Sequence, residues 1–278
     1  MFSALNPKWN LLAFRELLSL LTKHRELTWE LTRREIRERY SGQVFGTLWA
    51  IGHPLALTLV YVFIFAFVFR MRVGGSLDMP LDYTAYMLSG LIPWLTMQES
   101  MGKASTTITA NAHIVKQVIF PLEVLPVKSV LATLVSEAVF LVLLAVYTLV
   151  TSHTLLWTYA LLPLLVLFQV FLMIGIGYLL SSIGAFFRDI KDFVQVFLSI
   201  AFFILPILYL PEAVPVAVRY ILYINPFSYM IWVFQDVLYF GRFAHPWAWW
   251  VFGVGSLALF IIGYRVFRKL KVMFGNVL

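Results

Sequence analysis

Long stretches without a single charged side chain recur along this sequence of 278 residues. Residues 44–69, 155–187, 193–211 and 243–264 contain no Asp, Glu, Lys or Arg. The apolar core of a bilayer is about 30 Å thick, and a helix needs about 20 apolar residues to cross it. Hydrophobic residues make up 61% of the chain and its mean hydropathy is +0.86, far outside the range of soluble domains. The sequence therefore predicts an all-α polytopic membrane protein.

Six membrane spans are predicted from these apolar runs and the polar segments between them. Residues 1–43 are expected to form a cytoplasmic amphipathic helical segment on the membrane surface, and residues 44–278 the transmembrane domain. The spans are expected at about residues 44–69, 83–101, 124–150, 157–187, 193–211 and 247–264. The second span carries several breaker and polar residues and should be broken; these are Gly90, Pro93, Gln98, Glu99 and Ser100. Small residues in the fourth span should allow close helix contacts; these are Gly175, Gly177 and Gly184.

The segment before the last span decides the topology. Its charge-free part, residues 220–235, is interrupted by Asn225-Pro226 and is too short to cross a bilayer. We therefore predict periplasmic gate helices over residues 213–241, two short re-entrant helices that membranes tolerate only where protein buries them. With six spans and both termini in the cytoplasm, 17 Lys and Arg lie in inside segments and four in outside segments. This bias agrees with the positive-inside rule.

The chain lacks a nucleotide-binding motif of its own. Its single Gly-Lys pair, Gly102-Lys103, is followed by Ala104, and Met97 stands where the first P-loop glycine is required. Any ATP and Mg must therefore be handled by another chain. With no cysteine and five scattered histidines, no metal site is predicted. The formal charge of +7 fits topology control better than binding to nucleic acid.

Four aromatic residues on irregular or re-entrant segments are candidates for a substrate channel, because flat aromatic faces bind the C–H surfaces of sugars. They are Tyr83, Tyr86, Trp94 and Tyr209. The alternative for the chain's aromatic residues in general is an aromatic belt at headgroup level. Glu99 and Glu137 are ionisable groups at membrane depth, and they serve either ion coupling or ligand contact or a structural hydrogen bond.

An ordered set of short motifs gives the chain its resemblance to a known family. Residues 37–50 read RERYSGQVFGTLWA, followed by GLIPW at 90–94, KQVIFPLEVLP at 116–126, FRDI at 187–190, PILY at 206–209 and Asn225-Pro226. In this order they resemble the permease subunit of ATP-binding-cassette exporters of the type-2 class. The branch is the one that exports O-antigen and related polysaccharides or teichoic acids. The resemblance covers residues 28–271.

The resemblance implies a homodimer in the bacterial cytoplasmic (inner) membrane, with two copies of a separate ATPase subunit beneath it. It also implies an undecaprenyl-diphosphate-linked polysaccharide as cargo. The segment 102–123 would contain the main helix that couples to the ATPase, and the turn at 188–192 a secondary contact. The candidate coupling residues are Asn111, His113, Lys116, Gln117, Glu123, Arg188 and Asp189.

A cluster of arginines precedes the first span and lies where the anionic inner leaflet and a lipid diphosphate would be. These residues are Arg33, Arg34, Arg37 and Arg39. Their alternative role is topology control. Two other functions remain open at this point: a type-2 permease for drugs or small lipids, and an ion-coupled carrier or membrane-embedded enzyme that depends on Glu99 or Glu137.

Overall fold

The computed structural model describes residues 16, 19, 22–68, 80–116 and 120–277, and all regular secondary structure in this part of the chain is helical. The α-helices are α2 (Arg25–Arg39), α3 (Trp49–Val62), α4 (Tyr83–Ala110), α5 (Ala112–Val115), α6 (Val124–Ser152), α7 (Leu162–Phe186), α8 (Ile190–Ile204), α9 (Val216–Ile224), α10 (Pro226–Gln235) and α11 (Pro246–Val277). The short 3-10 or π-helical segments are η2 (Gly46–Leu48), η3 (Phe63–Val68), η4 (Trp157–Leu161), η5 (Pro211–Ala213) and η6 (Asp236–Phe240). The predicted all-α fold is confirmed.

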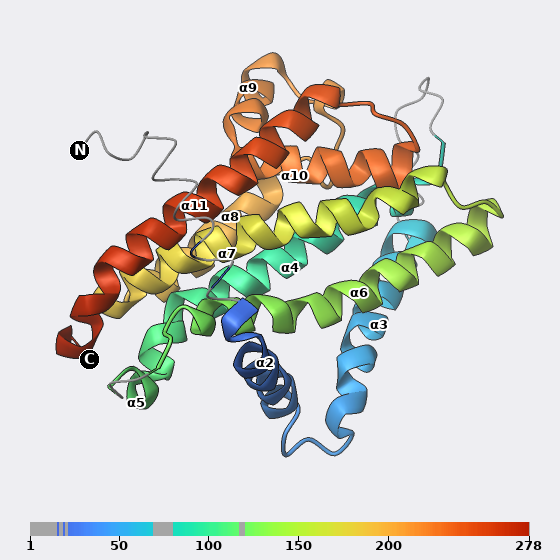
Figure 1. The fold of residues 1–278 in the computed structure, drawn as a ribbon. Coiled ribbons are helices and arrows are strands. Elements are labelled where there is room, and N and C mark those ends of the chain that lie inside the picture. Colours follow the sequence, from blue (N-terminus) through green and yellow to red (C-terminus); the bar gives the residue numbers. More distant parts are fainter. Residues whose placement is uncertain (1–15, 17–18, 20–21, 69–79, 117–119, 278) are drawn as a thin grey trace.

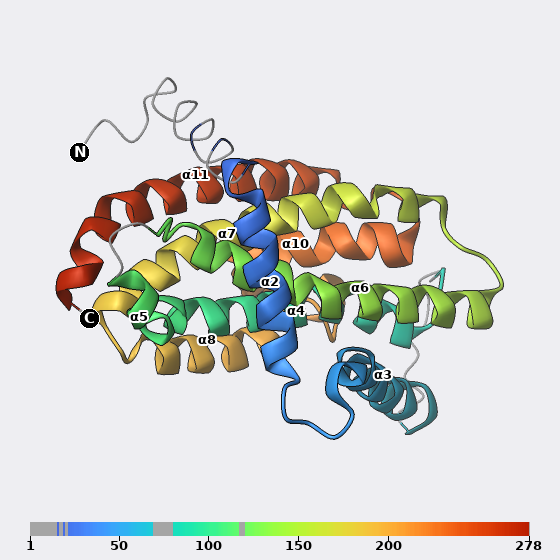
Figure 2. The same cartoon turned by 60° about the horizontal axis from the view of Figure 1, so that its bottom comes forward.

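The helix α4 forms the centre of a bundle in which α4, α6, α7 and α11 run side by side (Figures 1 and 2). It packs against α6, α7, α8 and α10, while α7 packs along α11. Because neighbours enclose α4, side chains such as Met87, Trp94 and Met97 have no exposed surface. The arm formed by α2, α3 and η3 lies outside this bundle on the α6 side, where α2 crosses the bundle and α3 lies beside it (Figure 2).

Glycines bring the bundle helices into backbone contact. A Cβ atom on Gly175 of α7 would lie 2.5 Å from the backbone of Leu259 in α11, and one on Gly184 would lie 2.0 Å from the carbonyl oxygen of Ser105 in α4. Only a residue without a side chain permits this approach. The predicted close contacts are confirmed at these two positions. At Gly177 a Cβ would meet other side chains only at 3.8 Å, which is an ordinary distance.

Four helical segments are long and apolar enough to cross a membrane: Gly46–Val68, Val124–Ser152, Trp157–Phe186 and Pro246–Gly275. They correspond to the first, third, fourth and sixth predicted spans, and the chain is a multi-pass membrane protein. At the position of the fifth predicted span, α8 has 15 residues, which is too short to cross the apolar core of a bilayer alone. At the position of the second predicted span, α4 has 28 residues but is more polar than α3, α6, α7 and α11.

The prediction that the second span is broken is wrong, since α4 continues through Pro93 without interruption. The polar residues that suggested a break are instead partners of other helices. Gln98 donates to the carbonyl of Leu198 at 3.3 Å, and Glu99 pairs with Arg39. Packing on several sides outweighs the local cost of a proline in the helix. The predicted boundary at residues 101 and 102 therefore falls inside α4.

Two other boundaries also differ from the prediction. The helix α8 ends at Ile204, and the following turn is held by hydroxyl groups of α4: Tyr83 donates to Leu208 O at 2.6 Å and Tyr86 to Tyr209 O at 3.1 Å. The last helix continues 13 residues past position 264, to Val277. The start of the predicted N-terminal amphipathic segment lies outside the described residues.

Candidate functional site

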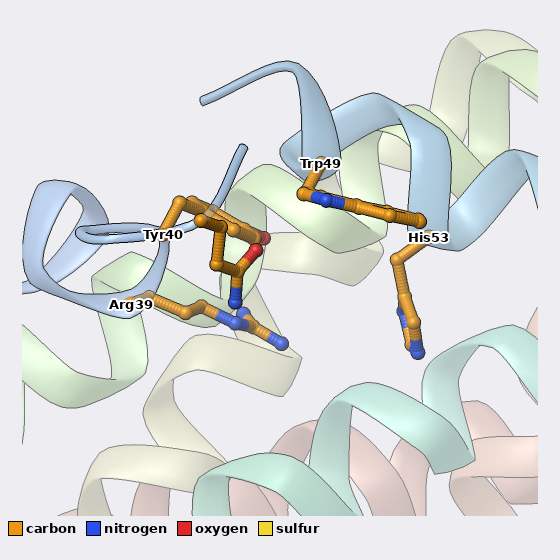
Figure 3. A pocket seen from close by; sticks show the side chains of 5 residues that line it. Arg39, Tyr40, Trp49 and His53 are labelled. Carbon is orange, nitrogen blue, oxygen red and sulfur yellow. The ribbon is translucent and has the colours of Figure 1, made fainter. Parts of the chain in front are cut away.

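A cavity of about 460 Å³ lies at the elbow between α2 and α3. Its lining residues are Arg39, Tyr40, Gln43, Trp49 and His53. Figure 3 shows Arg39 and Tyr40 extending from the end of α2, and Trp49 and His53 from α3 on the other side. The cavity therefore combines a guanidinium, an amide, an imidazole and two aromatic rings.

The chain between the two helices turns because of two glycines. Gly42 has a φ angle of 78° and Gly46 of 50°, which is the left-handed region that residues with a Cβ avoid. On the α2 side of the turn, Tyr40 is 7% exposed and the Cζ atom of Arg39 lies 5.5 Å from the centre of its ring. This distance is within the range of a cation–π contact, which restrains the guanidinium at the cavity wall.

A chain of alternating charges behind the cavity ties α2 to α4 and α6. Arg39 Nη1 lies 2.7 Å from Glu99 Oε1, and Lys103 Nζ lies 2.9 Å from the same oxygen. Glu35 on α2 lies 3.7 Å from Lys103 Nζ and 3.3 Å from Lys128 Nζ. All these side chains are less than a third exposed, so water screens the contacts only in part.

Two serines of α6 complete this network. Ser136 Oγ lies 3.4 Å from Arg39 Nη1, and the Ser129 hydroxyl donates to Glu35 Oε2 at 3.3 Å. The helix α2 itself turns Thr28 and Thr32 inward, and each satisfies its hydroxyl on the helix backbone four residues earlier. The network holds three cations and two anions, so it leaves one excess positive charge beside the cavity. An anion is the ligand that this balance favours.

Of the four arginines predicted to contact a lipid diphosphate, the cavity is lined by Arg39 alone. Arg33, Arg34 and Arg37 are exposed on α2. Arg34 Nε lies 2.6 Å from Glu38 Oε1, and this hydrogen bond raises the pKa of Arg34. Sequence reasoning did not find the partners Glu35, Lys103 and Lys128; it singled out only Glu99, from its charge at membrane depth.

Three of the four candidate channel aromatics gather at the start of α4. The rings of Tyr83 and Tyr86 are 6.4 Å apart, and both hydroxyls donate to the turn that contains Tyr209. Trp94 does not join them. It is fully buried, with its ring 5.6 Å from that of Phe227.

The candidate coupling residues divide into exposed and buried ones. His113 and Lys116, and Arg188 and Asp189, are exposed where the α4–α5 and α7–α8 connections meet at one end of the molecule (Figure 1). Asn111 ends α4 and donates to Thr107 O at 2.8 Å, while Gln117 lies outside the described residues. Glu123 is only 2% exposed and forms an ion pair with Lys271 of α11. It holds two helices together and does not face outward.

Glu137 is buried inside the bundle, with 1% of its surface exposed. Neither of its carboxyl oxygens has a hydrogen-bond partner within the described residues, and nor has Oε1 of the buried Gln169. Gln169 Nε2 donates to the carbonyl of Pro93 at 3.3 Å. In the same part of the chain no three His, Cys, Asp or Glu side chains group as a metal site would require.

The sequence model of a transporter family, described as ABC-2 type transporter, matches residues 26–239. The chain belongs to this family. The match includes α2, the elbow, the whole of α4 and the short helices α9 and α10. As an ABC-2 membrane permease subunit the protein is a transport component and not an enzyme, as the sequence predicts.

Individual relatives refine this assignment. The chain is 30% identical to the O-antigen export system permease protein RfbA of Klebsiella pneumoniae over 252 residues, which cover 89% of this chain and 93% of that protein. It is 29% identical to an RfbA of Myxococcus xanthus over 221 residues, 79% of this chain and 82% of the relative. The polysialic acid transport protein KpsM of Escherichia coli is 22% identical over 237 residues, 84% of this chain and 90% of KpsM. The ABC-2 permease described here is thus related to O-antigen and polysaccharide export permeases.

Proposed function

We propose that this ABC-2 permease is the membrane-spanning subunit of an ATP-driven exporter of polysaccharide linked to undecaprenyl diphosphate, of the O-antigen type. The observation that carries the proposal is the similarity to O-antigen export permeases along 89% of the chain. Two copies of the chain form the passage in the bacterial cytoplasmic membrane, and two separate ATPase subunits supply the energy.

The elbow cavity supports a role in binding the lipid diphosphate. A guanidinium carries five N–H donors, and the contacts of Arg39 with Glu99 and Ser136 use Nη1 only. Its other donors are free of protein partners in the described residues and suit phosphate oxygens. Trp49 and Tyr40 supply the amphipathic surfaces that are favoured at headgroup depth.

Six crossings with both termini in the cytoplasm remain the topology that we propose. Because other helices enclose α4, it does not need the apolar surface that a lipid-facing helix requires. The fifth crossing consists of α8 together with the turn at residues 205–210, which makes it longer than the helix alone. In this arrangement α9 and α10 are the periplasmic gate helices, residues 1–43 the cytoplasmic interface segment, and residues 44–278 the permease domain.

Exposed side chains support the proposed contacts with the ATPase and with lipid or the second copy. His113, Lys116, Arg188 and Asp189 share the end that we assign to the ATPase, together with Asn111 at the end of α4. Apolar side chains on η3 and α8, such as Phe63 (61% exposed) and Phe193 (72% exposed), face lipid or the second copy. The chain itself holds no ATP or Mg.

A genetic experiment tests this function. Cells that lack this chain should accumulate lipid-linked glycan on the cytoplasmic side of the membrane and lose it from the surface, and the wild-type gene should restore export. Arg39→Gln should restore little, whereas Arg34→Gln, which changes an exposed arginine of the same helix, should restore it fully. Normal surface glycan in cells without the chain would overturn the proposal.

A further inference from the structure

A second cavity, of about 250 Å³, lies at the end of α4 opposite to α5. Its wall is built from the first turn of α4, from η5, from α10 and from the loop before α11. Its lining residues with polar or charged groups are Tyr86, Glu212, Trp232, Gln235, Arg242 and His245. None of them belongs to the elbow cavity, which α2 and α3 form on the other side of the bundle.

Two buried polar atoms of this cavity lack partners. Gln235 and Trp232 have no exposed surface, and neither Oε1 of Gln235 nor Nε1 of Trp232 has a hydrogen-bond partner in the described part of the chain. The other end of the Gln235 amide is fixed, because Nε2 donates to Pro206 O at 2.8 Å. An orphaned acceptor and an orphaned donor in a protein interior each cost free energy. Both residues line the same cavity, so a ligand that carries donors and acceptors matches the two orphaned groups.

The wall beside these atoms is held in place by a buried carboxylate. Asp236, 1% exposed, accepts hydrogen bonds from the backbone N of His245 at 3.0 Å and from Trp249 Nε1 at 3.0 Å, and its Oδ1 lies 2.9 Å from His245 Nδ1. The imidazole is thereby fixed with its plane 14° from that of the Trp232 ring. Rigid surroundings reduce the entropy lost when a ligand binds.

Two charged residues line the same cavity. Arg242 and Glu212 are exposed, and in the described residues neither forms an ion pair. A guanidinium offers only donors and a carboxylate only acceptors, so together with the indole N–H and the amide oxygen the cavity presents both functions. The carboxylate disfavours a phosphate, and the guanidinium disfavours an amine. A neutral ligand with several hydroxyl groups fits this balance.

We propose that this cavity binds a single pyranose ring of a glycan. Sugar hydroxyls donate and accept at once, which matches the orphaned and charged groups. The aromatic wall, which includes Tyr86 and Phe240, suits the C–H face of the ring. The volume is below the ~300 Å³ at which pockets for larger ligands begin, so one ring enters and a longer segment does not. This inference rests on the proposed function, because it assigns a site to one unit of the exported polysaccharide.

Binding of simple glycosides tests the site directly. The permease with its ATPase is placed in nanodiscs, and saturation-transfer NMR is recorded with the methyl pyranosides of mannose, galactose and N-acetylglucosamine. The open-chain polyol mannitol is the matched ligand control. We expect transfer to at least one methyl pyranoside and none to mannitol. Absence of transfer to all three pyranosides would overturn the site.

Two variants locate the binding. Arg242→Ala, which changes an exposed side chain, and Trp232→Phe, which removes the orphaned N–H together with the five-membered ring of the indole, should each weaken binding of the pyranoside by about three- to tenfold. Trp250→Ala, 77% exposed on α11 and not in the lining, is the control and should bind like the wild type. Unchanged affinity in both Arg242→Ala and Trp232→Phe would contradict the proposal. Thermal unfolding of each variant shows whether Trp232→Phe folds, and Arg242→Ala remains decisive if it does not.

The outcomes separate this site from the proposed function. If the cells export glycan but the pyranosides do not bind, or bind equally to the variants, the function stands and the site is wrong. If pyranosides bind in a variant-sensitive way but deletion of the chain leaves surface glycan normal, the site stands and the function is wrong.

Discussion

The inner bundle and the outer arm are held in different ways. In the bundle, α7 meets α4 and α11 through backbone contacts at glycines. Of the most apolar stretch of the segment Trp157–Phe186, 39% is buried inside the protomer. In the arm, only 11% of the most apolar stretch of Gly46–Val68 is buried inside the protomer. The helix α2 is fixed by ion pairs to α4 and α6. The bundle therefore defines the fold of one protomer. The arm is placed by a few polar contacts and by what surrounds it.

The largest effect is expected where the bundle helices touch. Gly184→Val and Gly175→Val should each destabilise the protomer by at least about 3 kcal/mol, because the new side chain meets backbone that cannot move aside. Fluorescence-detected size exclusion after stepwise heating measures this loss. Gly177→Ala is the control in the same helix and should change little, since its Cβ would have ordinary contacts. Equal stability of all three variants would show that the backbone contacts at Gly175 and Gly184 do not hold the bundle together.

A second effect concerns the pair that joins α6 to α11. Glu123→Gln should destabilise the protein by about 2 kcal/mol, because Lys271 loses the partner of its ion pair. The sequence had placed Glu123 among the coupling residues with Lys116. We now expect the two to differ: Lys116→Glu should leave the unfolding temperature unchanged and reduce ATPase stimulation. If Glu123→Gln kept its stability but no longer stimulated the ATPase, Glu123 would be a coupling residue and not a structural one.

Within the arm, Glu99→Gln should loosen α2 and leave the bundle folded. Arg39 loses its charged partner and Lys103 keeps only the longer contact with Glu35, at a cost of about 1–2 kcal/mol. Because the chain has no cysteine, spin labels can be placed by a single cysteine on exposed Glu30 in α2 and another on Val135 in α6. The distance distribution between them should broaden in Glu99→Gln. Glu38→Gln, which breaks only the exposed pair with Arg34, should not broaden it.

The smallest effect is expected on the outer face of α3. Leu59→Ala should change protomer stability by less than about 0.5 kcal/mol, because Leu59 is 59% exposed. Met97→Ala in the centre of the bundle should cost about 2–5 kcal/mol, since its side chain is fully buried. Similar losses in both variants would show that the arm is as integral to the protomer as the bundle.

The same division separates what the sequence could predict from what it could not. Charge-free runs located three of the four candidate spans, because membrane crossing is a property of a continuous segment; the fourth, Val124–Ser152, contains Lys128 and Glu137. Glycines in the fourth span predicted the close contacts of α7. The elbow network joins residues far apart in the chain, such as Arg39 and Glu99, and no local pattern encodes that pairing.

The errors have a common physical cause. Polar residues in α4 suggested a broken helix, but they are partners for helices that pack around it. Glu123 has the charge of a surface residue, yet its partner Lys271 lies 148 positions away in the chain. The second cavity was missed for the same reason, because α4, α10 and two loops must meet before its orphaned atoms come together.

Transport in a defined system tests whether a separate ATPase drives export through this permease. Proteoliposomes are prepared with this chain alone and with the chain together with its ATPase, and delivery of undecaprenyl-diphosphate-linked glycan across the membrane is followed with and without ATP. We predict delivery only when ATPase and ATP are both present, and its loss in Arg39→Gln. Delivery by the chain alone, at the same rate without ATP, would contradict the proposal that a separate ATPase drives export.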